Sequence, residues 1–172
     1  MQETTLIPQE VIEKLKKVEI FSDLVSQSEA MEKVLKIIKK VVVPVGKQIT
    51  IEGEAGDDAF ILVKGSVRII KKTLQNEEYT VITLNEASHA LIGELGLLDS
   101  DKRSATVIAE TACELFVIHR NEFIEFGNQY PHLALPITRQ IAKVLSRRLR
   151  KSNQDFISLF SALVNEVSEG VF

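Results

Sequence analysis

The chain has 172 residues, of which 45% are hydrophobic and 26% are charged, and this composition is typical of one globular domain rather than a disordered segment. Its longest apolar run, residues 59–63, is only five residues long, whereas a membrane-spanning helix needs about 20. The first residues also lack the basic and apolar regions of a signal peptide. Cys113 is the only cysteine, which excludes disulfides within the chain and CxxC metal sites. We therefore expect a small, soluble, cytoplasmic domain.

The net charge of −3 is unevenly distributed along the chain. Residues 1–130 carry −6 and residues 131–172 carry +3, and all six cations of the second part lie within residues 139–151. An acidic main body argues against general nucleic-acid binding.

Helical periodicity marks the two ends of the chain. Pro8 is suited to a helix start and is followed at helical spacing by Val11, Ile12, Leu15 and Val18. A second amphipathic pattern predicts a helix through Met31, Val34, Leu35 and Ile38 that ends before Pro44. These patterns predict an N-terminal helical segment over residues 1–40.

Short runs rich in β-branched residues, separated by glycine or polar turns, fill residues 41–119. Such runs predict an all-β sandwich or barrel. Residues 120–172 return to helical spacing, with a break at Tyr130-Pro131 and one long helix from about residue 132 toward 167. We expect one domain, mainly β with flanking α-helices.

Two glycine-bearing stretches lie in the β region. Residues 53–65 read GEAGDDAFILVKG, and their glycines fit two hairpin turns around one apolar strand. Residues 93–98 read GELGLL, and Arg103 and Ser104 follow closely. Arginine and a hydroxyl suit a phosphate, and the Glu94 carboxylate suits sugar hydroxyls, so this set fits a ribose phosphate. The alternative is a Glu94–Arg103 ion pair that only braces a loop.

These two stretches, together with the entry segment 15–21 and the run 111–114, resemble the cyclic nucleotide-binding domain family, and most closely its bacterial catabolite activator branch. The resemblance covers about residues 15–155 and implies a double-stranded β-helix (jelly-roll) with a phosphate-binding cassette at 92–107. It also implies a long C-terminal helix over the ligand.

The resemblance further implies the ligand contacts. Glu94 would bind the ribose 2′-hydroxyl and Arg103 the cyclic phosphate, while Ser104, Ala105, Gly93 and Leu95 complete the cassette. Adjacent polar residues of the long helix, here Ser152 and Asn153, would contact adenine, so the implied ligand is cyclic AMP, with cyclic GMP as the alternative. The family glycines match at Gly46, Gly53, Gly56 and Gly65, where we expect structural roles.

Three features depart from the family pattern. Lys102 replaces a frequent proline, and residues 84–92 form a longer segment that lacks its customary glycine. The helix-turn-helix domain of a catabolite activator has no counterpart after Phe172, so direct DNA binding is not expected. A sensor acting within or beside a channel or kinase, and an interaction scaffold with an empty pocket, remain alternatives to a free receptor.

The remaining features carry weaker signals. Arg139, Lys143 and Arg147 share one helix face, and a solvated surface is favoured over a contact with nucleic acid or an acidic partner. The apolar pattern within residues 156–167 predicts a helix that folds back on the domain or pairs with a second copy or an effector protein. The three histidines show no metal-ligand spacing, and no GxSxG or Walker sequence is present. We therefore expect no catalytic residues, no metal and no cofactor.

Overall fold

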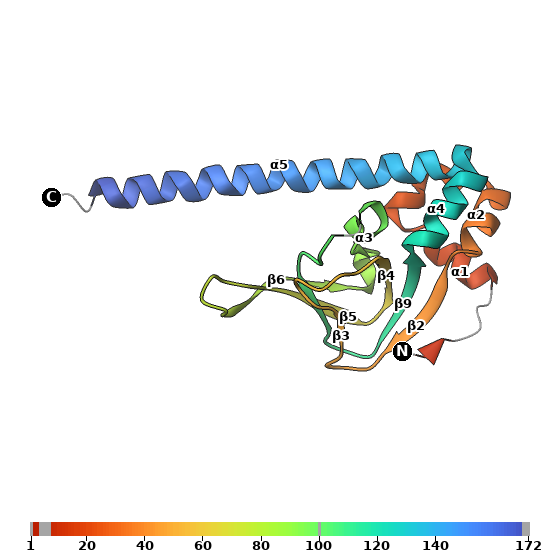
Figure 1. The fold of residues 1–172 in the computed structure, drawn as a ribbon, viewed down its shortest axis with the longest axis horizontal. Helices are drawn as coiled ribbons and strands as arrows, with labels where there is room; N and C mark the ends of the chain where they lie inside the picture. Colours follow the sequence, from red (N-terminus) through yellow and green to blue (C-terminus); the bar gives the residue numbers. More distant parts are fainter. Residues whose placement is uncertain (1, 4–7, 100, 170–172) are drawn as a thin grey trace.

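The computed structural model describes residues 2–3, 8–99 and 101–169. Its strands form two antiparallel sheets, with helices at both ends of the chain (Figure 1). The five-stranded sheet has the order β1-β2-β9-β4-β7, and its strands are β1 (Gln2–Glu3), β2 (Lys39–Val43), β9 (Cys113–His119), β4 (Asp58–Lys64) and β7 (Leu91–Ile92). The four-stranded sheet has the order β3-β8-β5-β6, and its strands are β3 (Gln48–Thr50), β8 (Thr106–Ala109), β5 (Ser66–Lys72) and β6 (Glu78–Asn85). The fold class expected from the sequence is confirmed.

The helices lie against one face of the five-stranded sheet. They are α1 (Pro8–Leu15), η1 (Glu19–Leu24), α2 (Ser28–Leu35), α4 (Arg120–Gln129) and α5 (Pro131–Glu169), while the short η2 (Glu86–Ser88) and α3 (Leu95–Leu98) lie in the β region. Pro8 is the first residue of α1, as the sequence predicts. The α5 helix extends well beyond the rest of the domain (Figure 1).

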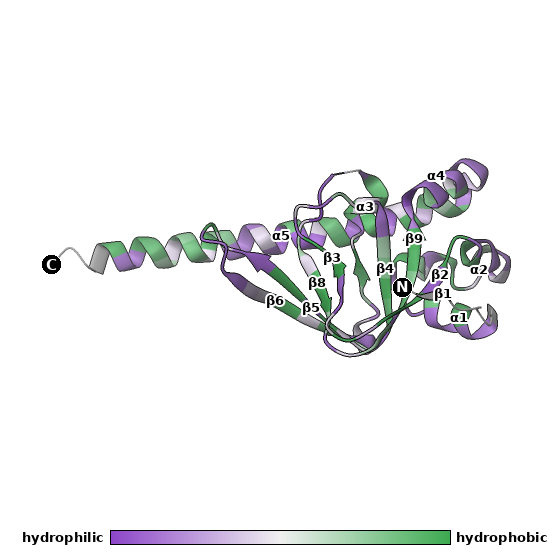
Figure 2. Ribbon diagram, turned by 60° about the horizontal axis from the view of Figure 1, so that its bottom comes forward, coloured by the Kyte–Doolittle hydropathy of each residue, from purple (hydrophilic) through white to green (hydrophobic). Residues whose placement is uncertain are grey.

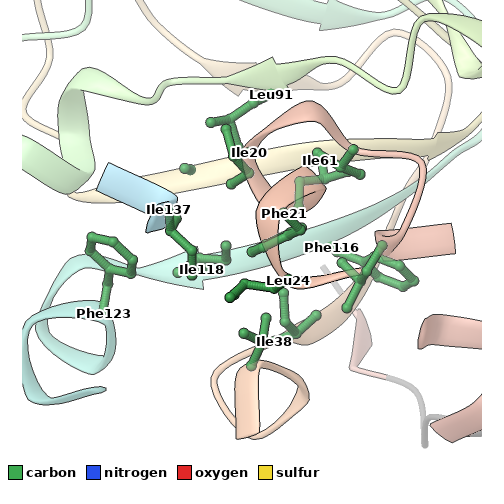
Figure 3. Packing of buried hydrophobic residues seen from close by; sticks show 14 of the residues in the cluster. Ile20, Phe21, Leu24, Ile38, Ile61, Leu91, Phe116, Ile118, Phe123 and Ile137 are labelled. Atoms are coloured by element: carbon green, nitrogen blue, oxygen red, sulfur yellow. The ribbon is translucent and has the colours of Figure 1, made fainter. Parts of the chain in front are cut away.

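Strand β4 shows why its apolar run is continuous. Phe60 and Leu62 point into the core between the two sheets, and Ala59 and Ile61 point into the core beneath the helices. A strand buried on both faces needs apolar residues at successive positions. Figure 3 shows the core on the helix side, where Phe21 and Leu24 of η1 meet Phe116 and Ile118 of β9. Ile137 of α5 is fully buried in the same cluster.

The predicted end of the second helix is wrong. Helix α2 ends at Leu35, and the chain turns sharply through two bonds, from Ile37 N to the Val34 carbonyl and from Ile38 N to the Leu35 carbonyl. Strand β2 then begins at Lys39, so the helical segment does not reach residue 40, and Gln2–Glu3 pair with β2 as a strand. Ile38 lies outside the helix but fits the helical spacing of apolar residues, because the turn buries its side chain in the same core as those of α2.

The C-terminal apolar segment does not fold back on the domain. Helix α5 continues outward, and its projecting half carries exposed apolar residues among polar ones (Figure 2). These are Phe156, Ile157, Leu159, Phe160, Leu163, Val164 and Val167. No described helix is long and apolar enough to cross a membrane.

Candidate functional site

The cassette expected at 92–107 begins where β7 ends. Strand β7 pairs with β4, with Phe60 opposite Ile92, so the longer segment before the cassette still enters the site as a short strand. Gly93 follows with φ of +74°, a conformation that L side chains rarely adopt. The chain then enters α3 with bonds from Gly96 N to the Gly93 carbonyl and from Leu97 N to the Glu94 carbonyl. The glycine thus turns the chain so that Glu94 stands at the start of this helical turn.

Arg103 lies in a recess that glycines leave open. A Cβ atom at Gly56 would lie 1.9 Å from its Nε, and one at Gly93 would lie 2.7 Å from its Nη1. A Cβ at Gly96 would lie 3.0 Å from the same nitrogen. Gly56 is therefore needed for close approach, while Gly46, Gly53 and Gly65 occupy turns with positive φ. The sequence analysis expected structural roles for these four glycines. Gly56 allows a side chain to approach closely, and the other three allow a backbone conformation with positive φ.

Contacts with β4 hold the guanidinium in this recess. Arg103 Nη1 donates to the Asp58 carbonyl at 2.6 Å, and the guanidinium carbon lies 5.7 Å from the centroid of the Phe60 ring. Burial lowers the pKa of Arg103, and the Asp58 and Asp57 carboxylates oppose that shift. The group stays charged at neutral pH because a guanidinium is not deprotonated in proteins. It forms no ion pair with any residue that the structure describes, so its charge is available for an anion.

The Asp58 carbonyl is itself held in place. The Asp58 carboxylate makes a short contact with Nδ1 of His119 at the end of β9. Arg120 N donates to the Asp57 carbonyl at 2.8 Å, and Arg103 N donates to the Glu54 carbonyl at the same distance. These bonds connect the guanidinium recess to the start of α4.

Glu94 pairs with the long helix rather than with Arg103. It is only 4% exposed, and its carboxylate forms a short ion pair with Nη1 of Arg148 in α5. Arg148 Nη2 also lies 3.5 Å from the Leu91 carbonyl. The interpretation of Glu94 and Arg103 as a pair that braces the loop is therefore wrong, because the two side chains have different partners.

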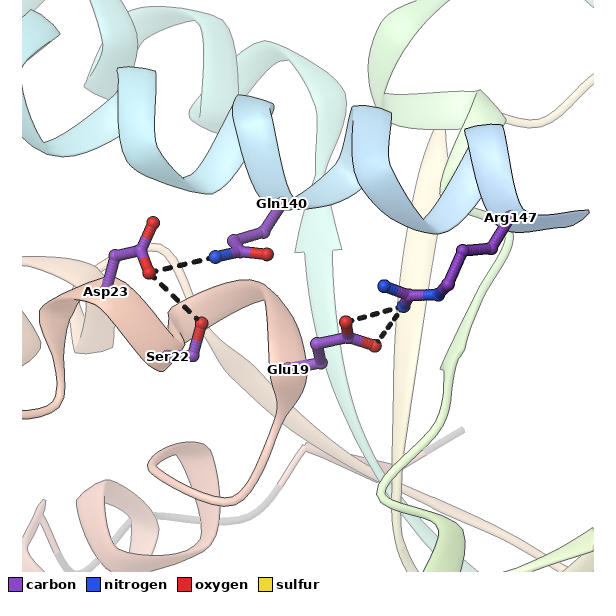
Figure 4. Close-up of polar contacts among 5 residues, drawn as sticks. All are labelled: Glu19, Ser22, Asp23, Gln140 and Arg147. Carbon is purple, nitrogen blue, oxygen red and sulfur yellow. Dashed lines mark hydrogen bonds and ion pairs between the residues drawn. The ribbon is translucent and has the colours of Figure 1, made fainter.

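A second set of polar contacts holds α5 against η1 (Figure 4). Arg147 Nη2 donates to both carboxylate oxygens of Glu19, at 2.5 and 2.6 Å, and Gln140 Nε2 donates to Asp23 at 2.9 Å. Of the predicted basic face, Arg139 and Lys143 are exposed, and Arg147 makes this contact. The adjacent Arg147 and Arg148 thus connect α5 to two different parts of the domain.

These elements enclose a cavity of about 700 Å³. Seven of the predicted ligand residues line it: Gly93, Glu94, Leu95, Arg103, Ser104, Ala105 and Ser152. Asn153 is not among the described residues that line it. Neighbouring residues of an α-helix point about 100° apart, so Ser152 and Asn153 present different faces. A ligand contact by Asn153 stays a prediction.

The structure adds residues that sequence reasoning missed. Arg148 and Leu149 of α5 line the cavity, as do Val81, Ile82 and Leu84 of β6. Arg148 stands four residues before Ser152, so helical spacing already placed both on one face. The β6 side chains carried no comparable signal, since a short run rich in β-branched residues only predicts a strand. No group of His, Cys, Asp and Glu among the described residues is placed to hold a metal ion.

The sequence model of the "Cyclic nucleotide-binding domain" family matches residues 40–130. The chain belongs to the cyclic nucleotide-binding domain family. Within the family, it is 29% identical over 125 residues to the cyclic AMP receptor protein of Thermus thermophilus, covering 73% of this chain and 55% of that protein. It is 34% identical over 95 residues to the cAMP-activated global transcriptional regulator CRP of Salmonella typhimurium, covering 55% of this chain and 44% of that one.

Solved structures of the family share the fold. The crystal structure of the Thermus thermophilus catabolite activator protein superposes with a TM-score of 0.72 at 27% identity, over 82% of this chain and 62% of that one. The catabolite activator type expected from the sequence is thereby confirmed. This cyclic nucleotide-binding domain spans about half the length of the curated relatives described above.

The ion pair between Glu94 and Arg148 predicts a measurable effect on stability. Arg148→Met leaves a nearly buried carboxylate without its cation, so we expect the free energy of unfolding to fall by about 1–3 kcal/mol. Urea denaturation without ligand at neutral pH measures this change. Arg150→Met, a change of the same kind at an exposed residue, is the control and should stay within about 0.5 kcal/mol.

A double-mutant cycle separates the ion pair from other effects of Arg148. In a Glu94→Gln background, Arg148→Met should cost less than in the original chain, because no buried charge remains to be left unpaired. An equal loss in both backgrounds would contradict a stabilising ion pair.

Proposed function

We propose that this domain is a non-enzymatic receptor for cyclic AMP that acts in the cytoplasm. The observation that carries the proposal is one cavity whose wall holds a partly buried cation, Arg103, and a nearly buried carboxylate, Glu94. A ligand with both a phosphate and free sugar hydroxyls satisfies the two groups together. The curated relatives named above are cAMP-responsive regulators by their names, which supports the same ligand.

The phosphate and ribose contacts follow from the chemistry of the side chains. Arg103 keeps N–H donors beyond the one that bonds Asp58, and these suit phosphate oxygens. The Ser104 hydroxyl is exposed at the edge of the cavity and supplies another donor. Glu94 accepts from the ribose 2′-hydroxyl while Arg148 continues to balance its charge. Gly93, Leu95 and Ala105 complete this part of the cavity wall.

The base lies between β6 and α5 in this proposal. Val81, Ile82 and Leu149 give the cavity apolar surface for a purine ring, and Ser152 gives it one hydroxyl. We assign the base as adenine from Ser152 and from the relatives' names. The alternatives are cyclic GMP as ligand and a scaffold that binds no nucleotide.

Isothermal titration calorimetry with cyclic AMP tests the proposal. Arg103→Ala removes a charge-assisted contact in a partly desolvated site, so we expect affinity to fall by at least about 30-fold. The control is Arg139→Ala, an exposed arginine of α5 whose loss should leave affinity unchanged. Tighter binding of cyclic GMP would overturn the choice of base, and a wild-type chain that binds neither nucleotide would favour the scaffold.

We further propose that the ligand acts on α5. Glu94 serves both Arg148 of α5 and the proposed ribose hydroxyl, so ligand and helix share one carboxylate. A ligand that touches both the cassette and α5 stabilises the arrangement in which these elements approach each other. The neighbouring pair Arg147–Glu19 extends this effect to η1.

Amide hydrogen exchange tests this coupling. Cyclic AMP should slow exchange at residues 93–107 and also at 145–160, because both segments lose access to water. The Arg103→Ala variant at the same nucleotide concentration is the control and should show neither change. Protection of the cassette alone would contradict a switch through α5.

The same helix is proposed to pair with a second copy of the chain. Leu149, Asn153, Phe156, Phe160, Leu163 and Val167 alternate at spacings of four and three residues, which is a heptad pattern. The apolar members of this heptad stripe are 58% to 69% exposed. Asn153 lies within the heptad stripe, where one asparagine can set helix register. An unknown effector protein is the alternative occupant.

Sedimentation velocity at micromolar concentration tests the pairing. The wild-type chain should sediment as a dimer, and Phe160→Glu should make it monomeric because it puts a charge into the heptad stripe. Gln154→Glu adds the same charge on the opposite helix face and should remain dimeric. A monomeric wild-type chain would overturn the proposed self-association. An unknown effector protein would then remain as the occupant of the heptad stripe.

A further inference from the structure

His119 lies at the junction between β9 and α4, and the proposed function gives its side chain no role. It stands opposite Asp58 in the register of β4 and β9, and it directly precedes α4. Its Nδ1 contacts the Asp58 carboxylate, while the Asp58 backbone carbonyl accepts from Arg103 Nη1 at 2.6 Å. One residue, Asp58, therefore separates this imidazole from the cation that is proposed to bind the phosphate.

The chemistry of the contact fixes which ring nitrogen carries a proton. An ionised carboxylate only accepts hydrogen bonds, so Nδ1 of His119 donates to Asp58 whether the ring is neutral or charged. Protonation at Nε2 changes the charge of the ring and leaves this contact in place. Histidine is the side chain that ordinarily changes its charge between pH 5 and pH 8.

The two carboxylates beside Arg103 have opposite effects on the cation and on its ligand. Burial lowers the pKa of Arg103, and the Asp58 and Asp57 carboxylates raise it, so they stabilise the cation. The same negative charges repel any anion that approaches the guanidinium. A charged His119 ring in contact with Asp58 offsets one of them, whereas a neutral ring does not.

The other charges at this junction have partners of their own. Glu122 of α4 is paired with Lys39 of β2 at 2.9 Å, and Arg120 N donates to the Asp57 carbonyl at 2.8 Å. The charged groups on the elements around His119 are Lys39, Asp57, Asp58, Arg103, Arg120 and Glu122. Because Asp58 is the acid that pairs with His119, protonation of the ring acts first on Asp58.

We propose that His119 is a positioning residue of the phosphate site, and that its protonation strengthens the binding of the cyclic phosphate. The inference rests on the proposed function, because it concerns the regulation of the same Arg103 site. The neutral ring leaves the Asp58 charge to oppose the phosphate, and the charged ring removes that opposition. Affinity for cyclic AMP therefore rises as the pH falls through the titration of His119, and by linkage the protein takes up protons when the ligand binds.

The expected effect is small because both side chains are partly exposed. Solvent and salt screen an interaction of this kind. A charge that lies near the phosphate without touching it should change affinity by about threefold between pH 8 and pH 6.

Calorimetry with cyclic AMP at both pH values, in two buffers of different ionisation enthalpy, tests the inference. The wild-type chain should bind about threefold more tightly at pH 6 and take up protons on binding. His119→Asn puts a neutral amide nitrogen where histidine has Nδ1, and asparagine is favourable before a helix, so this variant should fold and lose both effects. Equal wild-type affinity at the two pH values without proton uptake would overturn the inference and leave the receptor function standing. A wild-type chain that binds no cyclic AMP at either pH would overturn both.

A second variant separates the charge of Asp58 from its structural contacts. Asp58→Asn keeps the backbone carbonyl that accepts from Arg103 and removes the opposing charge. It should bind cyclic AMP more tightly than the wild-type chain at pH 8 and lose the pH dependence. A merely structural role of the contact predicts weaker binding instead, and that result would contradict the inference.

The remaining histidines supply the control. His89 and His132 are the only others in the chain, so the double variant His89→Asn/His132→Asn keeps His119 as its single histidine. This variant should retain the threefold pH dependence. Its loss would assign the effect to another histidine and overturn the role of His119.

Discussion

The burial of one cation, Arg103, constrains the whole ligand site. Arg103 is only partly buried, but even partial loss of water around a guanidinium is costly unless partners offset it. Here the Asp58 carbonyl, the charges of Asp57 and Asp58, and the Phe60 ring offset it. All of these partners come from β4 or the turn before it, so the cassette must dock against that strand. The docking is close enough to require glycine at 56, 93 and 96.

Helix α5 completes the site through two neighbouring arginines. Arg147 bonds Glu19 in η1, and Arg148 bonds Glu94 in the cassette. A rotation of the helix about its axis would disturb both contacts, so the N-terminal helices and the cassette fix the same helix position. Leu149 lies at the border between the cavity and the exposed heptad stripe. The proposed ligand contacts and the proposed self-association therefore lie on adjacent faces of one helix.

The segment between β6 and β7 leads the chain into the cassette. Ala90 and Leu91 line the cavity that Arg103 and Glu94 border, and the Leu91 carbonyl lies 3.5 Å from Arg148 Nη2. This segment therefore contacts both the cassette and α5.

The sequence by itself determined the β-sandwich, the flanking helices and most of the cassette. The apolar run 59–63 between two glycine turns predicted one strand, and the structure shows that both of its faces are buried. Glu94, Arg103 and Ser104 lie close enough in the chain for their spacing to predict a common site, and all three line one cavity. Only the tertiary structure decided that Arg148, 54 residues further along the chain, is the partner of Glu94. It also decided that α2 stops at Leu35 and that Ser152, not Asn153, lines the cavity. The first and third outcomes depend on how α5 is rotated and docked on the domain, and the second depends on a turn that buries Ile38. The spacing of apolar residues in a sequence specifies neither the docking of a helix nor the position of such a turn.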